Sequence, residues 1–226
     1  MKYNLKKWIC IVNIIGCVQF IIITAVAMFF YKGGTYVDPS TTHYLFWYNY
    51  FSDLGRIIAH SGVPNTISFI LFTFTLSIWG LFQIPFFYVL YNHFKENPHQ
   101  KKLSLVGSIL GGLTGVFYIG IAFTPSDVSG ISHDLFVILG FGSIYICILI
   151  YTLLILKNEN YPNLYGVILL ISAIILSIYF IFLAATPGNL TSTGLFIYVV
   201  GQKFMIYTLL ICGIIQSYGV IKQLDI

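Results

Sequence analysis

Six long apolar stretches most constrain what this chain can fold into. Each has about 20 residues or more, which is the length that an α-helix needs to cross a hydrocarbon core of about 30 Å. The apolar residues are continuous and do not alternate with polar ones, so they indicate helices and not the strands of an outer-membrane barrel. The stretches cover residues 8–31, 65–94, 103–123, 133–156, 164–185 and 195–220. They predict an all-α fold, a polytopic membrane helical bundle with six transmembrane helices in a single domain, residues 1–226.

The composition excludes the other main classes of protein. Of the 226 residues, 58% are hydrophobic and 8% are charged, whereas a soluble domain carries charge at roughly 25% of its positions. A surface so poor in charge does not keep a globular monomer in solution. The 20 Phe and 17 Tyr residues also exclude a disordered chain, because such chains are polar and poor in aromatics. An integral, multi-pass membrane protein is the class that remains.

Proline and glycine mark the ends of the apolar stretches. Pro85 is the exception, because it lies inside the second stretch, where neighbouring helices can satisfy the carbonyl that it frees. We expect it to kink that helix and not to end it. The breakers in the connections are Gly33-Gly34, Pro64, Pro98, Pro125, Pro162 and Pro187-Gly188.

The basic residues of the loops set the orientation by the positive-inside rule. Eight lysines lie on one side, whereas Lys32 and Arg56 lie on the other. The eight are Lys2, Lys6, Lys7, Lys95, Lys101, Lys102, Lys157 and Lys222. We therefore expect both termini in the cytoplasm and the protein in the plasma membrane. The net charge of +4 then reflects lysines that meet anionic lipid headgroups, and it indicates no nucleic acid as a partner.

The first apolar stretch is expected to remain as a membrane anchor. The lysines before it resemble the start of a signal peptide, but the apolar run is too long and has no small-x-small cleavage site. The chain also has four cysteines, all within spans and without a CxxC or metal-binding spacing, so we interpret them as small buried hydrophobes. They are Cys10, Cys17, Cys147 and Cys212.

Small residues form a stripe along the third span. Gly107, Gly111 and Gly115 recur every four residues, a pattern that lets another helix approach closely. Packing within the bundle is the favoured use, because a six-helix bundle has many internal contacts to satisfy. A homo-oligomer or membrane scaffold held together through the same glycines is the alternative.

Two turns on the expected outer side look alike. Thr124-Pro125-Ser126-Asp127 and Thr186-Pro187-Gly188-Asn189 lie 62 residues apart, and each precedes an apolar stretch. One interpretation is a helical-hairpin repeat of the third-plus-fourth and fifth-plus-sixth spans. The alternative is that any outer loop begins with a helix-stopping proline. Asn189 also begins an N-x-[ST] sequon.

Ionisable residues gather on the outer side, although such groups are costly near a membrane. They are Asp53, Arg56, His60, Asp127, His133 and Asp134. The first outer loop, residues 32–64, is long enough to indicate structure or function of its own. A helix over residues 46–60 would place Asn49, Asp53, Arg56 and His60 within about 60° of arc. The spacing therefore predicts an interfacial helix that presents a polar stripe.

Lys203 and a few amides lie within the spans. Lys203 is eight positions into the sixth span, about 12 Å below its outer end at 1.5 Å per residue. It either snorkels to the outer face or lines an outward-opening cavity with Gln202, where it would meet Asp53, Asp127 or an anionic headgroup. The amides are interpreted as interhelical hydrogen-bonders, too dispersed to form a transport path. They are Asn13, Gln19, Gln83 and Gln216.

These residues support two hypotheses of function from different classes. The first is a non-transporting membrane protein that binds membrane lipid headgroups or a small polar ligand at its outer face, without a cofactor. Its binding residues are Asp53, Arg56, His60, Asp127, His133, Gln202 and Lys203. The second is a membrane-embedded lipid hydrolase or transferase, with catalytic candidates His60, His133 and Asp134. In its metal-dependent form, a divalent metal is held by Asp53, His60, Asp127 and His133.

Purely structural roles account for part of the same pattern. Asp53 and Arg56 have the i,i+3 spacing of a helical ion pair. Ser132 has the chemistry of a helix N-cap, and Asp134 that of a first-turn acid that complements the helix dipole. No HExxH or GxSxG motif is present in the sequence, so no specific catalytic signature decides between the hypotheses.

Three short motifs resemble a known family. Phe51-Ser52-Asp53-Leu54-Gly55 resembles the Ser-Asp-Leu-Gly signature of the domain of unknown function 998 family, which is distantly similar to the FRAG/DRAM/Sfk group of six-span proteins. Phe123-Thr124-Pro125-Ser126-Asp127 with His133, and Gly201-Gln202-Lys203, resemble that family's motifs at the fourth and last spans. The resemblance implies six spans with Asp53, Asp127, His133 and Lys203 on one side of the membrane. It implies no established reaction, although the FRAG-type proteins are linked to lipid remodelling.

Overall fold

The structure is a computed structural model that describes residues 3–95, 98–185 and 191–224. The part of the chain within these ranges is helical, with six long helices and one short 3-10 helix, η1 (Phe51–Gly55). The long helices are α1 (Tyr3–Phe30), α2 (Thr66–Phe94), α3 (Pro98–Phe123), α4 (Gly130–Leu156), α5 (Asn163–Ala185) and α6 (Ser192–Leu224). The all-α prediction is confirmed for the described residues, and all six helices are long and apolar enough to cross a membrane, which supports a multi-pass membrane protein. Each expected span falls on one helix, with ends that differ by at most five residues.

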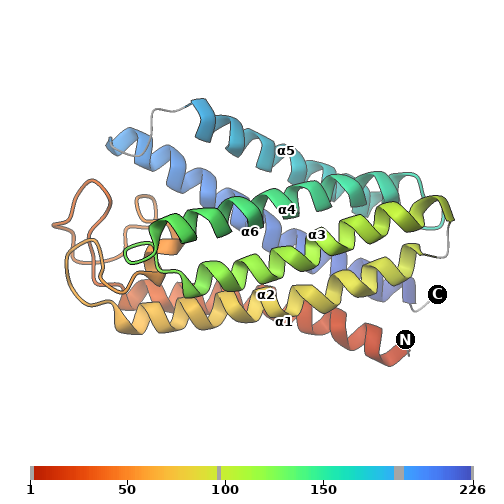
Figure 1. Ribbon diagram of the computed structural model, residues 1–226, viewed down its shortest axis with the longest axis horizontal. Coiled ribbons are helices and arrows are strands. Elements are labelled where there is room, and N and C mark those ends of the chain that lie inside the picture. Colours follow the sequence, from red (N-terminus) through yellow and green to blue (C-terminus); the bar gives the residue numbers. More distant parts are fainter. Residues whose placement is uncertain (1–2, 96–97, 186–190, 225–226) are drawn as a thin grey trace.

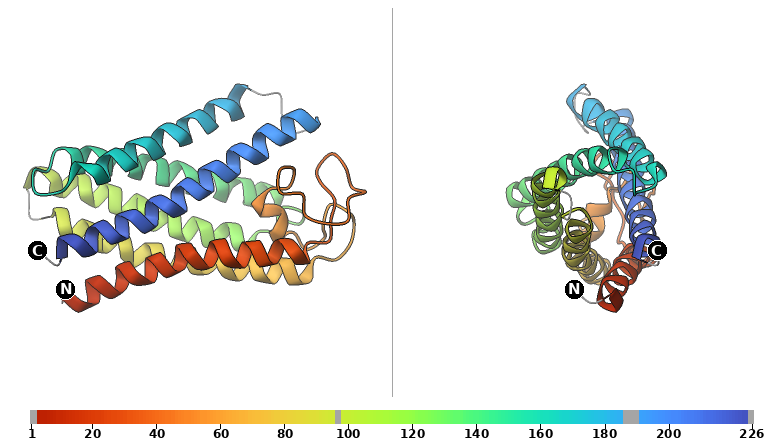
Figure 2. Two further views of the ribbon diagram at one scale, coloured as in Figure 1. Left: turned by 180° about the vertical axis from the view of Figure 1, so that it is seen from behind. Right: turned by 90° about the vertical axis from the view of Figure 1, so that its right-hand side faces the viewer.

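The helices run up and down and form a ring. Helices that follow one another in the chain pack side by side, and α6 returns to pack against α1 (Figure 2). Both termini lie at one end of the bundle, here called the terminal end, and residues 31–65 cover the other, here called the loop end (Figure 1). Towards the loop end α5 leans away from α4, so the bundle is less compact on that side (Figures 1 and 2).

Glycines allow α2 and α3 to touch through their backbones. A Cβ atom on Gly115 would lie 2.3 Å from the Gly80 carbonyl oxygen, and one on Gly80 would lie 2.5 Å from that of Gly115. Gly111 faces the Phe87 ring of α2, and Gly107 faces Ile150 and Tyr151 of α4. The stripe is therefore used for packing within the chain, as the favoured interpretation expected. A homo-oligomer through the same glycines stays a prediction.

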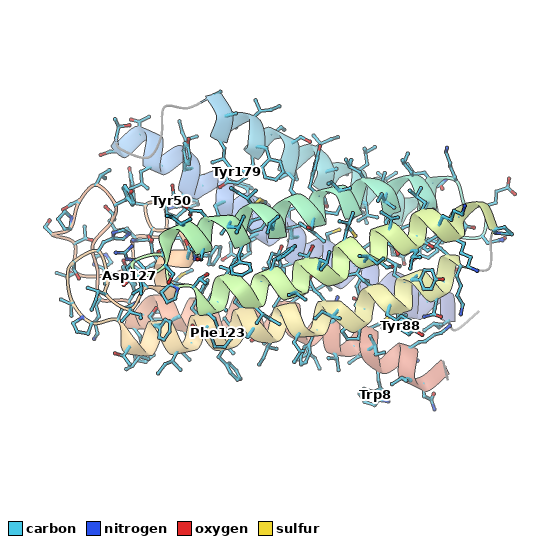
Figure 3. All side chains as sticks on the ribbon, viewed as in Figure 1. Trp8, Tyr50, Tyr88, Phe123, Asp127 and Tyr179 are labelled. Carbon is cyan, nitrogen blue, oxygen red and sulfur yellow. The ribbon has the colours of Figure 1, made fainter. Side chains whose placement is uncertain are left out.

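Exposed aromatic side chains lie near both ends of the bundle, as in the belts at membrane–water interfaces. Trp8 and Tyr88 are exposed towards the terminal end, and Phe123 is exposed towards the loop end (Figure 3). The α2 helix continues through Pro85, which agrees with the expectation that this proline does not end it. One of the two similar turns, residues 186–189, and with it the Asn189 sequon, lies outside the described residues.

The prediction of an interfacial helix over residues 46–60 is wrong. Only η1 is helical in this range, and Ile58 forms an isolated bridge with Pro64. The reason is that polar side chains bond the local backbone and compete with a helix. Asn49 Oδ1 accepts from the Leu45 amide (2.8 Å), and Asp53 Oδ2 accepts from the Tyr50 amide (2.9 Å).

The loop folds into the mouth of the helix ring and closes the bundle at that end. Figure 2 shows η1 inside the ring when the molecule is viewed along its length. Phe51 and Leu54 are buried, and the Phe51 ring packs against Phe20 of α1 and Tyr207 of α6. The core of the bundle therefore extends into the loop, which fixes the loop's polar residues in place.

Candidate functional site

The Lys203 side chain lies beneath the loop. It is 2% exposed, and its ammonium donates to the Asn49 carbonyl (2.5 Å) and to the Tyr44 hydroxyl (3.1 Å). Three aromatic rings surround the same nitrogen at 4.8 to 5.3 Å from their centres, a cation–π arrangement. They belong to Tyr44, Phe46 and Phe51. Lys203 thus neither snorkels to the outer face nor lines an open cavity; it fastens the loop to α6.

Tyr44 supports this arrangement as a neutral phenol. Burial raises its pKa well above the ordinary value, and the nearby Asp53 charge raises it further. Its one hydroxyl proton is shared between the carbonyls of Asn49 (2.9 Å) and Tyr50 (3.0 Å), while the oxygen accepts from Lys203. The Asn49 oxygen therefore has two donors, and the segment from Tyr44 to Tyr50 is tied to itself and to α6.

Asp53 organises the centre of the loop. Its side chain is buried, and Oδ2 accepts from the Asn49 side-chain amide (3.0 Å) as well as from the Tyr50 amide. Its other oxygen lies 3.1 Å from His60 Nε2, which makes an Asp–His pair. The expected ion pair of Asp53 with Arg56 is absent among the described residues, because η1 is too short to give that spacing on one helical face.

Asp127 joins the loop to the turn between α3 and α4. Its carboxylate accepts from the backbone amides of Ile57 (3.2 Å) and Ile58 (2.8 Å), and it lies at the loop end of the bundle (Figure 3). Arg56 donates its Nε–H to the Ile58 carbonyl (3.0 Å). The two Nη groups of Arg56 have no hydrogen-bond partner among the described residues, so they are available to a ligand.

His133 is held in a defined orientation near the start of α4. The ring is buried, and Nδ1 lies 2.7 Å from the Thr124 carbonyl, to which a protonated Nδ1 donates. In the neutral ring this bond leaves Nε2 as an acceptor. Asp134, the next residue, is exposed.

Six of the expected site residues line one polar hollow of about 450 Å³ at the loop end. They are Asp53, Arg56, His60, His133, Asp134 and Gln202. All three catalytic candidates are among them. Asp127 and Lys203 do not line the hollow, because the first bonds loop amides and the second is buried under the loop. We refer to this space as the outer hollow.

The expected metal ligands do not form a metal site. Among the described residues, no group of three or more His, Cys, Asp or Glu side chains is close enough together to hold a metal ion. Asp53 and His60 form a pair, but Asp127 is turned towards backbone amides and His133 towards the Thr124 carbonyl. The sequence places these four residues on one side of the bundle, but their hydrogen bonds point them to different partners.

An apolar groove adjoins the outer hollow, and no sequence pattern predicted it. It has a volume of about 290 Å³ and lies between α4, α5 and α6, where α5 leans away. Phe141, Tyr179 and Leu183 are among its lining residues, and Tyr179 marks its position on α5 (Figure 3). Val137 and Gln202 line both the groove and the outer hollow, so the two spaces share a wall.

Comparison of the chain with protein-family models, curated proteins and solved structures finds no match in any of the three. The resemblance of its short motifs to the domain of unknown function 998 family stays a prediction.

Proposed function

We propose that this is a plasma-membrane protein that binds one membrane lipid at its outer face, with the headgroup in the outer hollow and an acyl chain in the apolar groove. The observation that carries the proposal is the shared wall at Val137 and Gln202, which joins a polar space to an apolar one. A lipid has the same two parts, a polar headgroup and an apolar acyl chain. A small polar ligand would need the hollow alone, and the groove favours the lipid.

The charges around the outer hollow suit a zwitterionic headgroup that carries a phosphate and an amine. Arg56 presents its Nη groups, and a guanidinium binds phosphate oxygens in a bidentate manner. Asp134 presents an exposed carboxylate in the same hollow for an ammonium. The Asp53 carboxylate already accepts from Asn49, Tyr50 and His60, so its role is to position the His60 ring.

The outer hollow faces outward in the proposed topology. Both termini lie at the end of the bundle opposite the hollow (Figure 1). Eight loop or terminal lysines belong to that terminal end by sequence, so the positive-inside rule places it in the cytoplasm. The bound headgroup would then belong to a lipid of the outer leaflet.

The binding proposal is tested by lipid retention in native mass spectrometry. Arg56→Ala is expected to weaken phospholipid binding about tenfold or more, because a hydrogen bond to a charged group contributes about 1.5–3 kcal/mol. Lys32→Ala is the matched control, since it removes the same charge from an exposed position of the loop that does not line the hollow. Equal retention in the two variants would contradict the proposal.

The groove is tested separately with a lipid and its free headgroup. Gly142 lines the groove but not the outer hollow, and a Cβ atom there would meet nothing within 4 Å, so Gly142→Phe would fill the groove and is expected to weaken binding of phosphatidylethanolamine. It is expected to leave the weaker binding of glycerophosphoethanolamine, which has no acyl chain, unchanged. If both ligands lose the same affinity, the groove does not take the chain and the site is that of a small polar ligand.

A headgroup hydrolase or transferase is the second candidate, and one contact favours it. His60 Nε2 lies 3.1 Å from Asp53 Oδ1, and both residues line the outer hollow beside Arg56. A carboxylate that orients a histidine is the arrangement of a general base. Incubation of the purified protein with radiolabelled phosphatidylethanolamine tests this candidate. Headgroup release by the wild type that is lost in His60→Gln would support an enzyme. If the wild type releases no headgroup, this candidate is contradicted.

A further inference from the structure

A further cavity lies at the centre of the bundle, and all six long helices line it. Its volume is about 50 Å³. Besides Tyr151, whose hydroxyl bonds Ser108 and the Ser104 carbonyl, five of its lining residues carry polar side chains that are almost completely buried: Asn13, Trp79, Gln83, Tyr118 and Gln216. They come from α1, α2, α3 and α6. We refer to this space as the central chamber.

Polar atoms of the central chamber lack hydrogen-bond partners. Four oxygens have none among the described residues: Asn13 Oδ1, Gln83 Oε1, Tyr118 Oη and Gln216 Oε1. The Trp79 indole N–H also has no hydrogen-bond partner among the described residues. A buried polar atom costs free energy unless something bonds it, and the cost is greatest where lipid replaces water around the bundle. Their convergence on one cavity points to an occupant that supplies hydrogen bonds.

The side-chain nitrogens of two of these amides are already hydrogen-bonded. Asn13 Nδ2 donates to Ser217 Oγ (2.9 Å), and Gln216 Nε2 donates to the Tyr165 carbonyl (2.9 Å). Because a carbonyl can only accept, the bond to Tyr165 fixes the orientation of the Gln216 amide and leaves its oxygen without a partner among the described residues. Gln19 is the contrast, because its nitrogen donates to Gly16 and Thr75 and its oxygen accepts from Thr75. Gln19 joins helices, whereas the chamber amides present acceptors to a ligand.

The lining determines the chemistry of the occupant. No Asp, Glu, Lys, Arg or His lines the chamber among the described residues, so a charged solute would be buried without a counter-ion. The amide oxygens accept hydrogen bonds, the Trp79 indole N–H donates and the Tyr118 hydroxyl can do both, so an occupant that bonds them all is an uncharged molecule that both donates and accepts. A cavity needs about 10–15 Å³ to hold one water molecule, so a volume of about 50 Å³ is sufficient for a small cluster.

A route to the chamber begins at the outer hollow. A smaller cavity of about 30 Å³ shares Ser52, His133 and Gln202 with the hollow and shares Trp79 and Tyr118 with the chamber. The Trp79 and Tyr118 rings pack 4.8 Å apart and form the partition. Towards the terminal end, stacked and edge-on rings close the bundle. They belong to Phe94, Tyr161 and Tyr165.

We propose that the central chamber is a hydrated site, occupied by a small cluster of water molecules that exchange with the outer hollow past Trp79 and Tyr118. Water would then reach from the outer side to about the middle of the bundle. The aromatic rings towards the terminal end would keep water from passing further. The chamber is independent of the lipid site, because none of the chamber residues with free oxygens lines the outer hollow.

The test is millisecond X-ray radiolysis of the full chain in phosphatidylcholine nanodiscs, read by mass spectrometry. Hydroxyl radicals form from water, so a buried side chain reacts only where water lies beside it. Cys147 lines the chamber and is 1% exposed, whereas Cys10 is 0% exposed and lies outside it. We expect Cys147 and Trp79 to be oxidised several-fold faster than Cys10. Equal, slow oxidation of Cys147 and Cys10 would overturn the proposal.

Exchange is measured by rapid mixing into H₂¹⁸O under anaerobic conditions before the pulse. The label is expected to appear on hydroxylated Trp79 as early as on Trp47, which is half-exposed in the outer loop. If the label appears late on Trp79 but early on Trp47, the chamber water does not exchange with the outer hollow and the proposed route is wrong. Gln83 Oε1 has no hydrogen-bond partner among the described residues, so Gln83→Leu removes an acceptor for water without breaking a bond of that oxygen. Fewer water molecules in the chamber are expected to slow oxidation of Cys147. An unchanged rate in that variant would also count against the proposal.

Discussion

The Lys203 ammonium is held by oxygens and aromatic faces. Its two hydrogen-bond acceptors, the Asn49 carbonyl and the Tyr44 hydroxyl, also bond each other, so both keep a partner if the lysine is removed. The Asp53 carboxylate is linked to Lys203 through the Asn49 residue. The Lys203 ammonium therefore attaches the loop to α6, and it has no direct part in the proposed headgroup site.

Lys203→Met tests this role. Methionine keeps most of the volume, and its sulfur makes favourable contacts with the surrounding rings, but these are weaker than cation–π contacts. We expect the variant to fold, to keep its phospholipid retention and to lose about 1–2 kcal/mol of stability. Thermal unfolding in detergent and native mass spectrometry measure the two effects. A loss of lipid as large as in Arg56→Ala would place the ammonium in the binding site.

Residue chemistry was easier to predict than residue partners. The sequence places Asp127 and Lys203 correctly among the polar groups of the loop end, because costly ionisable residues near a membrane are informative. Their partners include backbone groups of residues 49, 57 and 58, and no side-chain pattern identifies a backbone partner far along the chain. The predicted helix over residues 46–60 does not form for a related reason, since the Asn49 and Asp53 side chains bond the local backbone.

At the scale of the element, the loop is attached by contacts that a single substitution can remove. Asp127 protects the Ile57 and Ile58 amides, and it does so from the turn between α3 and α4. Asp127→Ala is expected to speed amide hydrogen exchange at these two residues. Asp38→Ala is the control, because that carboxylate bonds Ser40 within its own turn and should affect only Ser40. Unchanged exchange at Ile57 and Ile58 would contradict the attachment.

The contact between α2 and α3 is the second element-scale prediction. Gly115→Ala would push its Cβ against the Gly80 carbonyl oxygen, and the helices must separate. Overpacking of this kind costs about 1–3 kcal/mol. Gly112→Ala on the same helix meets nothing within 4 Å, so it is expected to be neutral or to stabilise by up to about 1 kcal/mol. Thermal unfolding compares the two, and similar midpoints would mean that the backbones are not in contact.

At the scale of the whole molecule, the six spans were predictable and the central chamber was not. Backbone groups in lipid must bond within their own helix, so an apolar stretch of sufficient length has little choice of structure. Asn13, Gln83 and Gln216 looked dispersed because they lie far apart in the sequence. A usable signal was present, since each lies between 8 and 11 residues from the terminal-side end of its helix. Polar residues at one depth in several spans therefore indicate a shared cavity.

The orientation of the whole molecule determines which leaflet supplies the proposed lipid, and cysteine accessibility in intact cells tests it. The four native cysteines are buried, so they give little background. Because the lysines of the terminal end should face anionic lipid in the cytoplasm, an impermeant thiol reagent is expected to label Lys32→Cys and not Lys157→Cys. Lys157→Cys should react once the membrane is permeabilised. The opposite pattern would turn the outer hollow to the cytoplasm, so that the bound headgroup would come from the inner leaflet, where anionic lipids compete for Arg56.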